Sequence, residues 1–124
     1  MAATHPHTDL KFRLDVEPER DAVRVCPQGE VDLATTDAIR EKFEEMSGLG
    51  FRRVALDLRE ATFMDSTGVR LALELAESSR SAAWEFAIID GPPAVQRVFE
   101  LTGVRSRLPF IAAAQIRHAH WGRS

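Results

Sequence analysis

Two adjacent hydroxyl side chains, Ser66 and Thr67, follow the carboxylate of Asp65 and lead into an apolar stretch. These residue types are typical of a helix N-terminus, where they satisfy free backbone N–H groups. The same place suits a phosphorylation site, because a phosphate there meets free N–H groups and the positive end of the helix dipole. A partner would then face a new charge of about −2. Both interpretations, a helix cap and a phosphorylation site, follow from the residues alone.

Catalytic chemistry finds little support elsewhere in the sequence. The four histidines lie in the terminal segments, so no base is placed for a nucleophilic serine or cysteine. Ser66 is not flanked as Gly-x-Ser-x-Gly, and neither of the usual glycine-rich nucleotide loops occurs. We therefore expect a protein that is not an enzyme and that needs no cofactor. The histidines themselves, His5, His7, His118 and His120, are interpreted as solvated side chains rather than metal ligands.

The remaining reactive residue types have simpler interpretations. Asp57 ends a predicted strand, as a receiver-domain phosphoacceptor would, but the acidic pair that such a site needs after the first strand is missing. A single cysteine excludes an internal disulfide and a multi-cysteine metal site. Its place in an apolar strand predicts that Cys26 is a small buried residue. We expect no metal site.

Length and composition indicate one small globular domain. The chain has 124 residues, of which 44% are hydrophobic and 28% charged, with a net charge of −3. This mildly acidic balance gives no reason to expect direct binding of nucleic acid. Apolar runs are shorter than the roughly 18 residues of a membrane helix, and the N-terminus lacks the pattern of a signal peptide. We expect a cytoplasmic protein without membrane contact.

The elements that must position these residues alternate along the chain. Residues 10–16 and 22–28 alternate apolar and polar side chains, which predicts a hairpin, with Pro27 at an edge or a bulge. Beyond it, the pattern predicts a helix from Thr35 or Thr36 to residue 47, a strand over 53–58, a loop over 61–65, a helix over 67–79, a strand over 84–89, a helix from the prolines at 92–93 to residue 102, and a short strand over 108–111.

This order predicts an α/β fold with a small mixed, largely parallel sheet and an N-terminal hairpin, because strands separated by helices form right-handed crossovers. We expect a flexible tail over residues 1–9, one domain over 10–111, and a helix extension or tail over 112–124. Apolar positions on the inner faces of these elements predict a core of Phe43, Leu56, Leu58, Leu73, Ile88, Val98 and Phe99.

Four stretches together resemble the STAS domain, a family named for sulfate transporters and anti-sigma factor antagonists. They are Gly-Glu-Val-Asp at 29–32, Val-Ala-Leu-Asp-Leu at 54–58, Phe-Met-Asp-Ser-Thr-Gly at 63–68, and the segment 93–103. The likeness spans residues 10–111, and a domain of this length is similar to the bacterial anti-sigma factor antagonists. The resemblance implies a STAS-like sheet with helices mostly on one face.

The resemblance also implies a partner switch. An unphosphorylated antagonist binds an anti-sigma factor that is a serine kinase and so frees the sigma factor; phosphorylation separates the two, and a serine phosphatase resets the antagonist. Ser66 matches the phosphorylated serine. The partner-binding residues implied are Asp32, Asp65, Ser66, Thr67, Gly68 and Arg70. Arg70 departs from members that have Gly-Leu-Gly after the hydroxyl pair, and it is either a solvated helix residue or a partner for a phosphate on Ser66.

Two other functions remain open from the sequence. One is a STAS scaffold subunit that binds its partners constitutively, in a stress-signalling or a lipid-transport complex. The other is a sensor of a small molecule or nucleotide, which the missing phosphate loop disfavours. We expect a monomer or a weak dimer.

Overall fold

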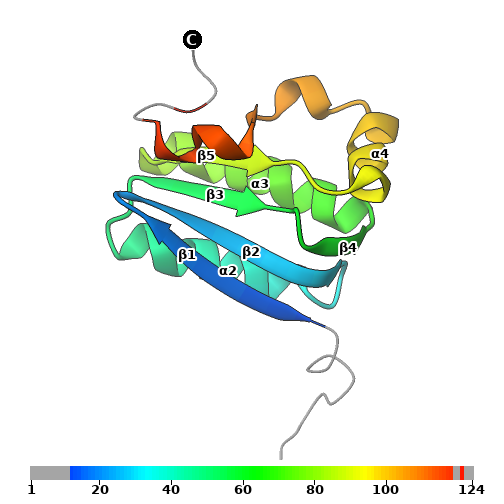
Figure 1. Cartoon of the computed structure of the whole chain (residues 1–124), viewed down its shortest axis with the longest axis horizontal. Coiled ribbons are helices and arrows are strands. Elements are labelled where there is room, and N and C mark those ends of the chain that lie inside the picture. The colour runs from blue at the N-terminus through cyan, green and yellow to red at the C-terminus, as the bar shows by residue number, and fades with distance from the viewer. Residues whose placement is uncertain (1–11, 119–120, 122–124) are drawn as a thin grey trace, which may run out of the picture.

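Six strands form one sheet in the order β1-β2-β3-β5-β6, with β4 paired to β2 outside this path (Figure 1). The computed structural model describes residues 12–118 and 121. The elements are β1 (Arg13–Glu19), β2 (Ala22–Val31), α2 (Thr36–Gly48), β3 (Arg53–Asp57), β4 (Ala61–Met64), α3 (Ser66–Ala82), β5 (Glu85–Ile89), α4 (Pro93–Thr102), η1 (Arg105–Arg107), β6 (Phe110–Ile111) and η2 (Ala113–Arg117). The expected tail over residues 1–9 lies outside the described part.

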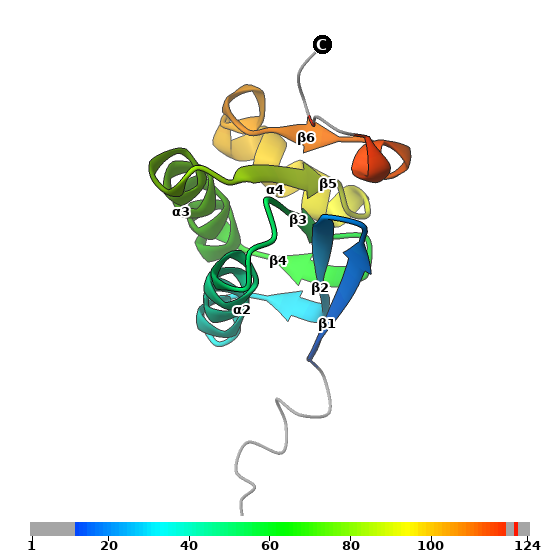
Figure 2. The same ribbon diagram turned by 90° about the vertical axis from the view of Figure 1, so that its left-hand side faces the viewer.

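The hairpin of β1 and β2 is antiparallel, and the pairs β2–β3, β2–β4, β3–β5 and β5–β6 are parallel. Figure 2 shows α2 and α3 side by side on one side of the sheet, with the C-terminal segment on the other. The mixed, largely parallel sheet with helices mostly on one face is thus confirmed. Among the described residues, none of the helices is both long and apolar enough to span a membrane.

The main core fills the space between the sheet and the helices. Phe43, Leu56, Leu58, Ile88 and Phe99 are buried as predicted. Two predicted core residues, Leu73 on α3 and Val98 on α4, are only partly buried.

Both residues are less buried than predicted for the same reason: each side chain points to one side of the buried face of its helix. The sheet-facing side of α3 is formed by Leu71, Ala72, Leu75 and Ala76, and Leu73 lies away from the middle of that arc. On α4, Val95 and Phe99 are the buried pair at i and i+4, so Val98 faces about 100° to one side.

The predicted loop over residues 61–65 is wrong, because Ala61–Met64 forms β4. This strand pairs in parallel with the end of β2, beyond the part of β2 that β3 covers. Its four residues have the burial order buried, exposed, exposed, buried, so no alternation marks them as a strand. The helix that follows is also longer than predicted: it ends at Ala82, and the next residue, Ala83, has φ of 63° in the left-handed region.

Two further predictions concern Pro27 and the C-terminal segment. Pro27, expected at an edge or a bulge, pairs with Leu14 of β1 but with neither β3 nor β4, because β2 changes its neighbour there, and a bulge follows between Gly29 and Glu30. The segment after residue 111, expected as a helix extension or a tail, contains the 3-10 helix η2, and its residues 119–120 and 122–124 lie outside the described part. Trp121 is buried against the guanidinium of Arg53, 5.1 Å from the ring centre, and helps η2 cover part of the open face of the sheet.

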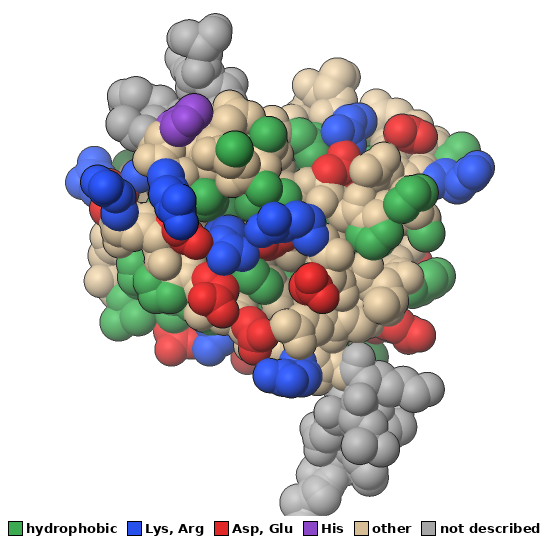
Figure 3. Space-filling model, in the orientation of Figure 1, with side chains coloured by type: hydrophobic (Ala, Val, Ile, Leu, Met, Phe, Trp, Pro, Cys, Tyr) green, Lys and Arg blue, Asp and Glu red, His purple; other side chains and the backbone are tan. Residues whose placement is uncertain are grey.

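A charged cluster occupies the rest of that open face, which Figure 3 shows as neighbouring basic and acidic side chains. Its centre is Asp57, which is 3% exposed and accepts hydrogen bonds from Arg24 at 2.7 Å and from Arg59 at 2.8 and 3.0 Å. Burial raises the pKa of the Asp57 carboxyl, but the hydrogen bonds from Arg59 and Arg24 outweigh this and lower that pKa overall. Both oxygens are therefore held in structural ion pairs.

Cys26 lies beside this cluster, with its sulfur 3.4 Å from the Arg24 guanidinium and 3.9 Å from the Asp57 carboxylate. The side chain is buried, as predicted from its strand. Burial, together with the nearby charge of Asp57, raises the pKa of the Cys26 thiol to about 12. Because the thiolate is the nucleophile, the folded protein holds this cysteine in an unreactive form.

We expect iodoacetamide at pH 8 to alkylate Cys26 at least about 100-fold more slowly in the native protein than in the guanidinium-unfolded chain. A thiol with the ordinary pKa near 8.5 is about one quarter ionised at that pH, whereas one with a pKa near 12 is ionised to about one part in ten thousand. Mass spectrometry of the intact protein follows the reaction, and this cysteine is the only thiol. Equal rates in the two states would show that the charged cluster does not enclose the sulfur.

Candidate phosphorylation and partner-binding site

The ends of two parallel strands bring the two acidic motifs together. Val31 at the end of β2 is paired with Met64 at the end of β4, so the next residues, Asp32 and Asp65, leave the sheet side by side. The backbone N–H of Asp65 donates to the carbonyl of Val31 at 3.3 Å. β4, the strand that the sequence did not predict, therefore joins the Gly-Glu-Val-Asp and Phe-Met-Asp-Ser-Thr-Gly stretches into one site.

Asp32 shapes the turn that leads into α2. Its carboxylate accepts from the backbone N–H of Ala34 at 3.0 Å. Thr35 takes the N-cap position of α2, but its hydroxyl donates to the carbonyl of Glu30 at 2.9 Å and caps no N–H of the helix. The hydroxyl also accepts from the N–H of Asp32 at 3.0 Å. These bonds hold the turn rigidly at the edge of the site.

Asp65 is the N-cap of α3, which confirms the cap interpretation for this residue. Its carboxylate accepts from the backbone N–H of Thr67 at 2.9 Å, and the hydroxyl of Thr67 donates to the same oxygen. Thr67 is half-buried. Both polar groups of Thr67 are thus turned toward the cap.

Ser66 is the first residue of α3, and its side chain is exposed. In the described part of the chain its hydroxyl makes no hydrogen bond, in contrast to that of Thr67. Helix α3 begins one residue earlier than predicted, and this difference separates the two hydroxyls. The accessible one belongs to Ser66.

Gly68 lies beneath this surface rather than on it. It is buried, and a Cβ atom there would lie 2.7 Å from Cγ and 2.9 Å from Cε of Met64. The missing side chain lets the first turn of α3 pack onto the end of β4. Of the predicted partner-binding residues, Gly68 therefore shapes the site, whereas Ser66 and Arg70 are exposed on it.

Two exposed apolar side chains beside these motifs are absent from the predicted site. Leu33, directly after Asp32, is 77% exposed, and Phe63 on β4 is 46% exposed. Large apolar groups at the exit of paired strands are suited to contact with another protein. A sequence pattern could not single them out, because an apolar residue next to a strand is normally expected in the core.

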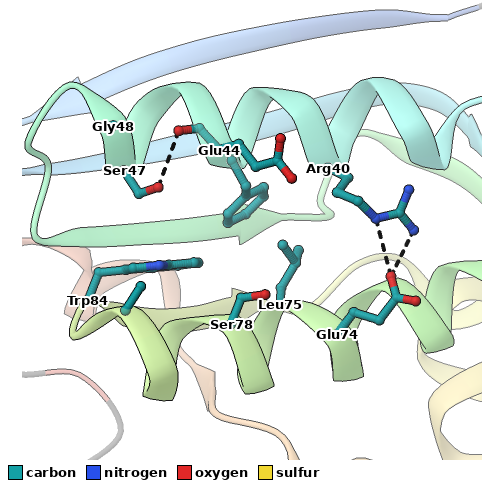
Figure 4. Close-up of a pocket in the computed structure, with 10 residues that line it drawn as sticks. Arg40, Glu44, Ser47, Gly48, Glu74, Leu75, Ser78 and Trp84 are labelled. Carbon is teal, nitrogen blue, oxygen red and sulfur yellow. Dashed lines mark hydrogen bonds and ion pairs between the residues drawn. The ribbon is translucent and has the colours of Figure 1, made fainter.

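A groove of about 330 Å³ separates the later parts of α2 and α3 (Figure 4). Its apolar wall contains Phe43, Leu75 and Trp84, and the ion pair of Arg40 with Glu74, at 2.7 Å, closes it on the side nearer Ser66. This ion pair joins the two helices beside the site. Glu74 lies one turn beyond Arg70 on α3, and its carboxylate is bound by Arg40.

The chain resembles known proteins over most of its length. Residues 13–115 match the STAS domain. The "Putative anti-sigma factor antagonist BtrV" of Bordetella bronchiseptica is 32% identical over 84 residues, which are 68% of this chain and 72% of that protein. The "Anti-sigma F factor antagonist" of Paenibacillus polymyxa is 26% identical over 101 residues, 81% of this chain and 86% of that protein.

Solved structures agree on the fold. Unphosphorylated SpoIIAA, described as an anti-sigma factor antagonist, superposes with a TM-score of 0.64 at 23% identity, over 84% of this chain and 90% of that one. The phosphorylated form of the Bacillus protein gives a TM-score of 0.59 at 22% identity, over 84% and 94% of the two chains. From the sequence match and the shared fold, the chain belongs to the STAS domain family.

Proposed function

We propose that this protein is an anti-sigma factor antagonist that regulates transcription by partner switching. Unphosphorylated, it binds an anti-sigma factor that is a serine kinase, and the sigma factor is freed. Phosphorylation of Ser66 releases the kinase, and a serine phosphatase restores the binding form. The protein is itself not an enzyme in this cycle, requires no cofactor, and works in the cytoplasm as a monomer or weak dimer.

The observation that carries this proposal is the exposed hydroxyl of Ser66 at the start of a 17-residue helix. Of the two adjacent hydroxyls, that of Thr67 is bonded to the Asp65 cap, so only that of Ser66 is free to meet a kinase. The names of the relatives support an anti-sigma factor as the partner. The structure of phosphorylated SpoIIAA is an example of a protein of this fold that carries a phosphate.

The position also explains how a phosphate could switch binding without unfolding the domain. At the N-terminus of α3 a phosphate meets free N–H groups and the positive end of the dipole, so the folded state tolerates it. An apolar contact that includes Leu33 and Phe63 does not tolerate it, because a charge desolvated there without a partner costs several kcal/mol.

We expect one phosphate on Ser66 when the protein is incubated with ATP, Mg²⁺ and its cognate kinase. Each anti-sigma factor kinase of the source genome is purified and tested in turn, and phosphopeptide mapping locates the label. Ser66→Ala should remove the label. Thr67→Val, which deletes only the neighbouring hydroxyl, should retain it. Label on Thr67, on the exposed Ser78 or on the buried Ser79 would contradict the assignment, as would no label from any of these kinases.

A further inference from the structure

Arg70 lies one helical turn after Ser66 on α3. Residues at i and i+4 are neighbours on a helix surface, with Cβ atoms about 5–6 Å apart. Long side chains on a helix generally lean toward its N-terminus, so the guanidinium of Arg70 can reach the turn that contains Ser66. A planar guanidinium can bind two phosphate oxygens at once. Arg70 is therefore within reach of a phosphate on Ser66.

The carboxylates around Arg70 are paired with other arginines, so Arg70 is free to bind a phosphate. It is exposed, and within residues 12–118 and 121 it forms no ion pair. Arg40, Glu74 and Glu77 line the same shallow hollow. Arg40 binds Glu74 at 2.7 Å, and Glu77 binds Arg80 at 2.7 Å.

The acidic groups near Ser66 also have hydrogen-bond partners already. The carboxylate of Asp65 is bonded to Thr67, and that of Asp32 accepts from the N–H of Ala34. Arg70 is thus the cation beside Ser66 that no carboxylate in the described part of the chain already binds.

We infer that Arg70 is the intramolecular receptor for the phosphate that Ser66 carries, an inference that rests on the proposed function. In the unphosphorylated protein, Arg70 is an exposed cation on the surface that meets the kinase. After phosphorylation, the guanidinium binds the phosphate and is withdrawn from that surface. The modification then changes the surface twice, by adding a negative charge and by removing a positive one from the partner's reach.

The second pKa of the phosphate reports this contact directly. A nearby cation favours the dianion over the monoanion, so the contact lowers this pKa. Phosphoserine is introduced at position 66 during translation with a suppressor tRNA, and the phosphorus chemical shift is followed by NMR from pH 4 to 8. We expect the phosphate pKa to be lower in the protein with Arg70 than in the Arg70→Gln variant by about 0.3 units or more.

Arg80→Gln is the matched control, because it removes the same charge from an exposed position on the same helix, about 21 Å along the helix from Ser66. It should leave the phosphate pKa at the value of the parent protein. An unchanged pKa in Arg70→Gln, or equal shifts in both variants, would overturn the inference. No kinase takes part in this experiment, so a failure of the proposed function would appear separately, as unlabelled protein in the kinase assay.

Discussion

Ser66→Asp should weaken binding to the anti-sigma factor kinase at least about a hundredfold and leave the domain folded. A carboxylate at the start of α3 is itself favourable by about 0.3–1 kcal/mol, because it meets the positive end of the helix dipole. In the complex, the same charge is desolvated beside apolar groups, which costs several kcal/mol. A loss of about 3 kcal/mol already corresponds to more than a hundredfold in Kd.

Isothermal titration calorimetry without ATP measures this, with the kinase that labels the parent protein. Ser66→Ala should bind like the parent and, once ATP is added, stay bound, so that the sigma factor remains active. Ser78→Asp is the matched charge control, on an exposed serine of the same helix about 18 Å away, and should bind normally. Native affinity in Ser66→Asp would favour the constitutive STAS scaffold instead.

The acidic motifs could be found in the sequence, and the family resemblance pointed to Ser66, but which of the three side chains caps the helix required the structure. Asp65, Ser66 and Thr67 are all good residues for a helix start, and composition cannot decide which of them caps it. The structure decides it because α3 begins at Ser66, which turns Thr67 toward the Asp65 carboxylate. The exposure of Phe63 could not be predicted, because it depends on how β4 pairs.

The fold could be predicted wherever an element was long enough to show its period. Helix α2 and strand β3 are periodic or continuously apolar, and their bounds differ from the predicted ones by a residue or so. β4 is different, because it exists only by pairing with the end of β2, a partner 32 or 33 residues away along the chain. Nothing local marks such a strand, and the junction that places Asp32 beside Asp65 depends on it.

Phe99→Ala is expected to destabilise the protein by about 3–5 kcal/mol, the usual cost of removing a buried aromatic ring and leaving a cavity. Phe99 has no exposed surface and packs edge-on against Phe110, with ring centres 5.1 Å apart. It joins α4 to the short last strand of the sheet and belongs to the main core, whose close packing limits relaxation around a cavity.

Leu101→Ala, on the same helix, is the control, because Leu101 is 76% exposed and its loss should change the free energy of unfolding by less than about 0.5 kcal/mol. Urea unfolding followed by the fluorescence of Trp84 and Trp121 gives both values. These tryptophans lie on opposite sides of the sheet, in the main core and in the C-terminal cover, so coincident transitions also test whether the domain unfolds as one unit. A loss below about 1 kcal/mol for Phe99→Ala would mean that α4 does not hold its buried face against the sheet.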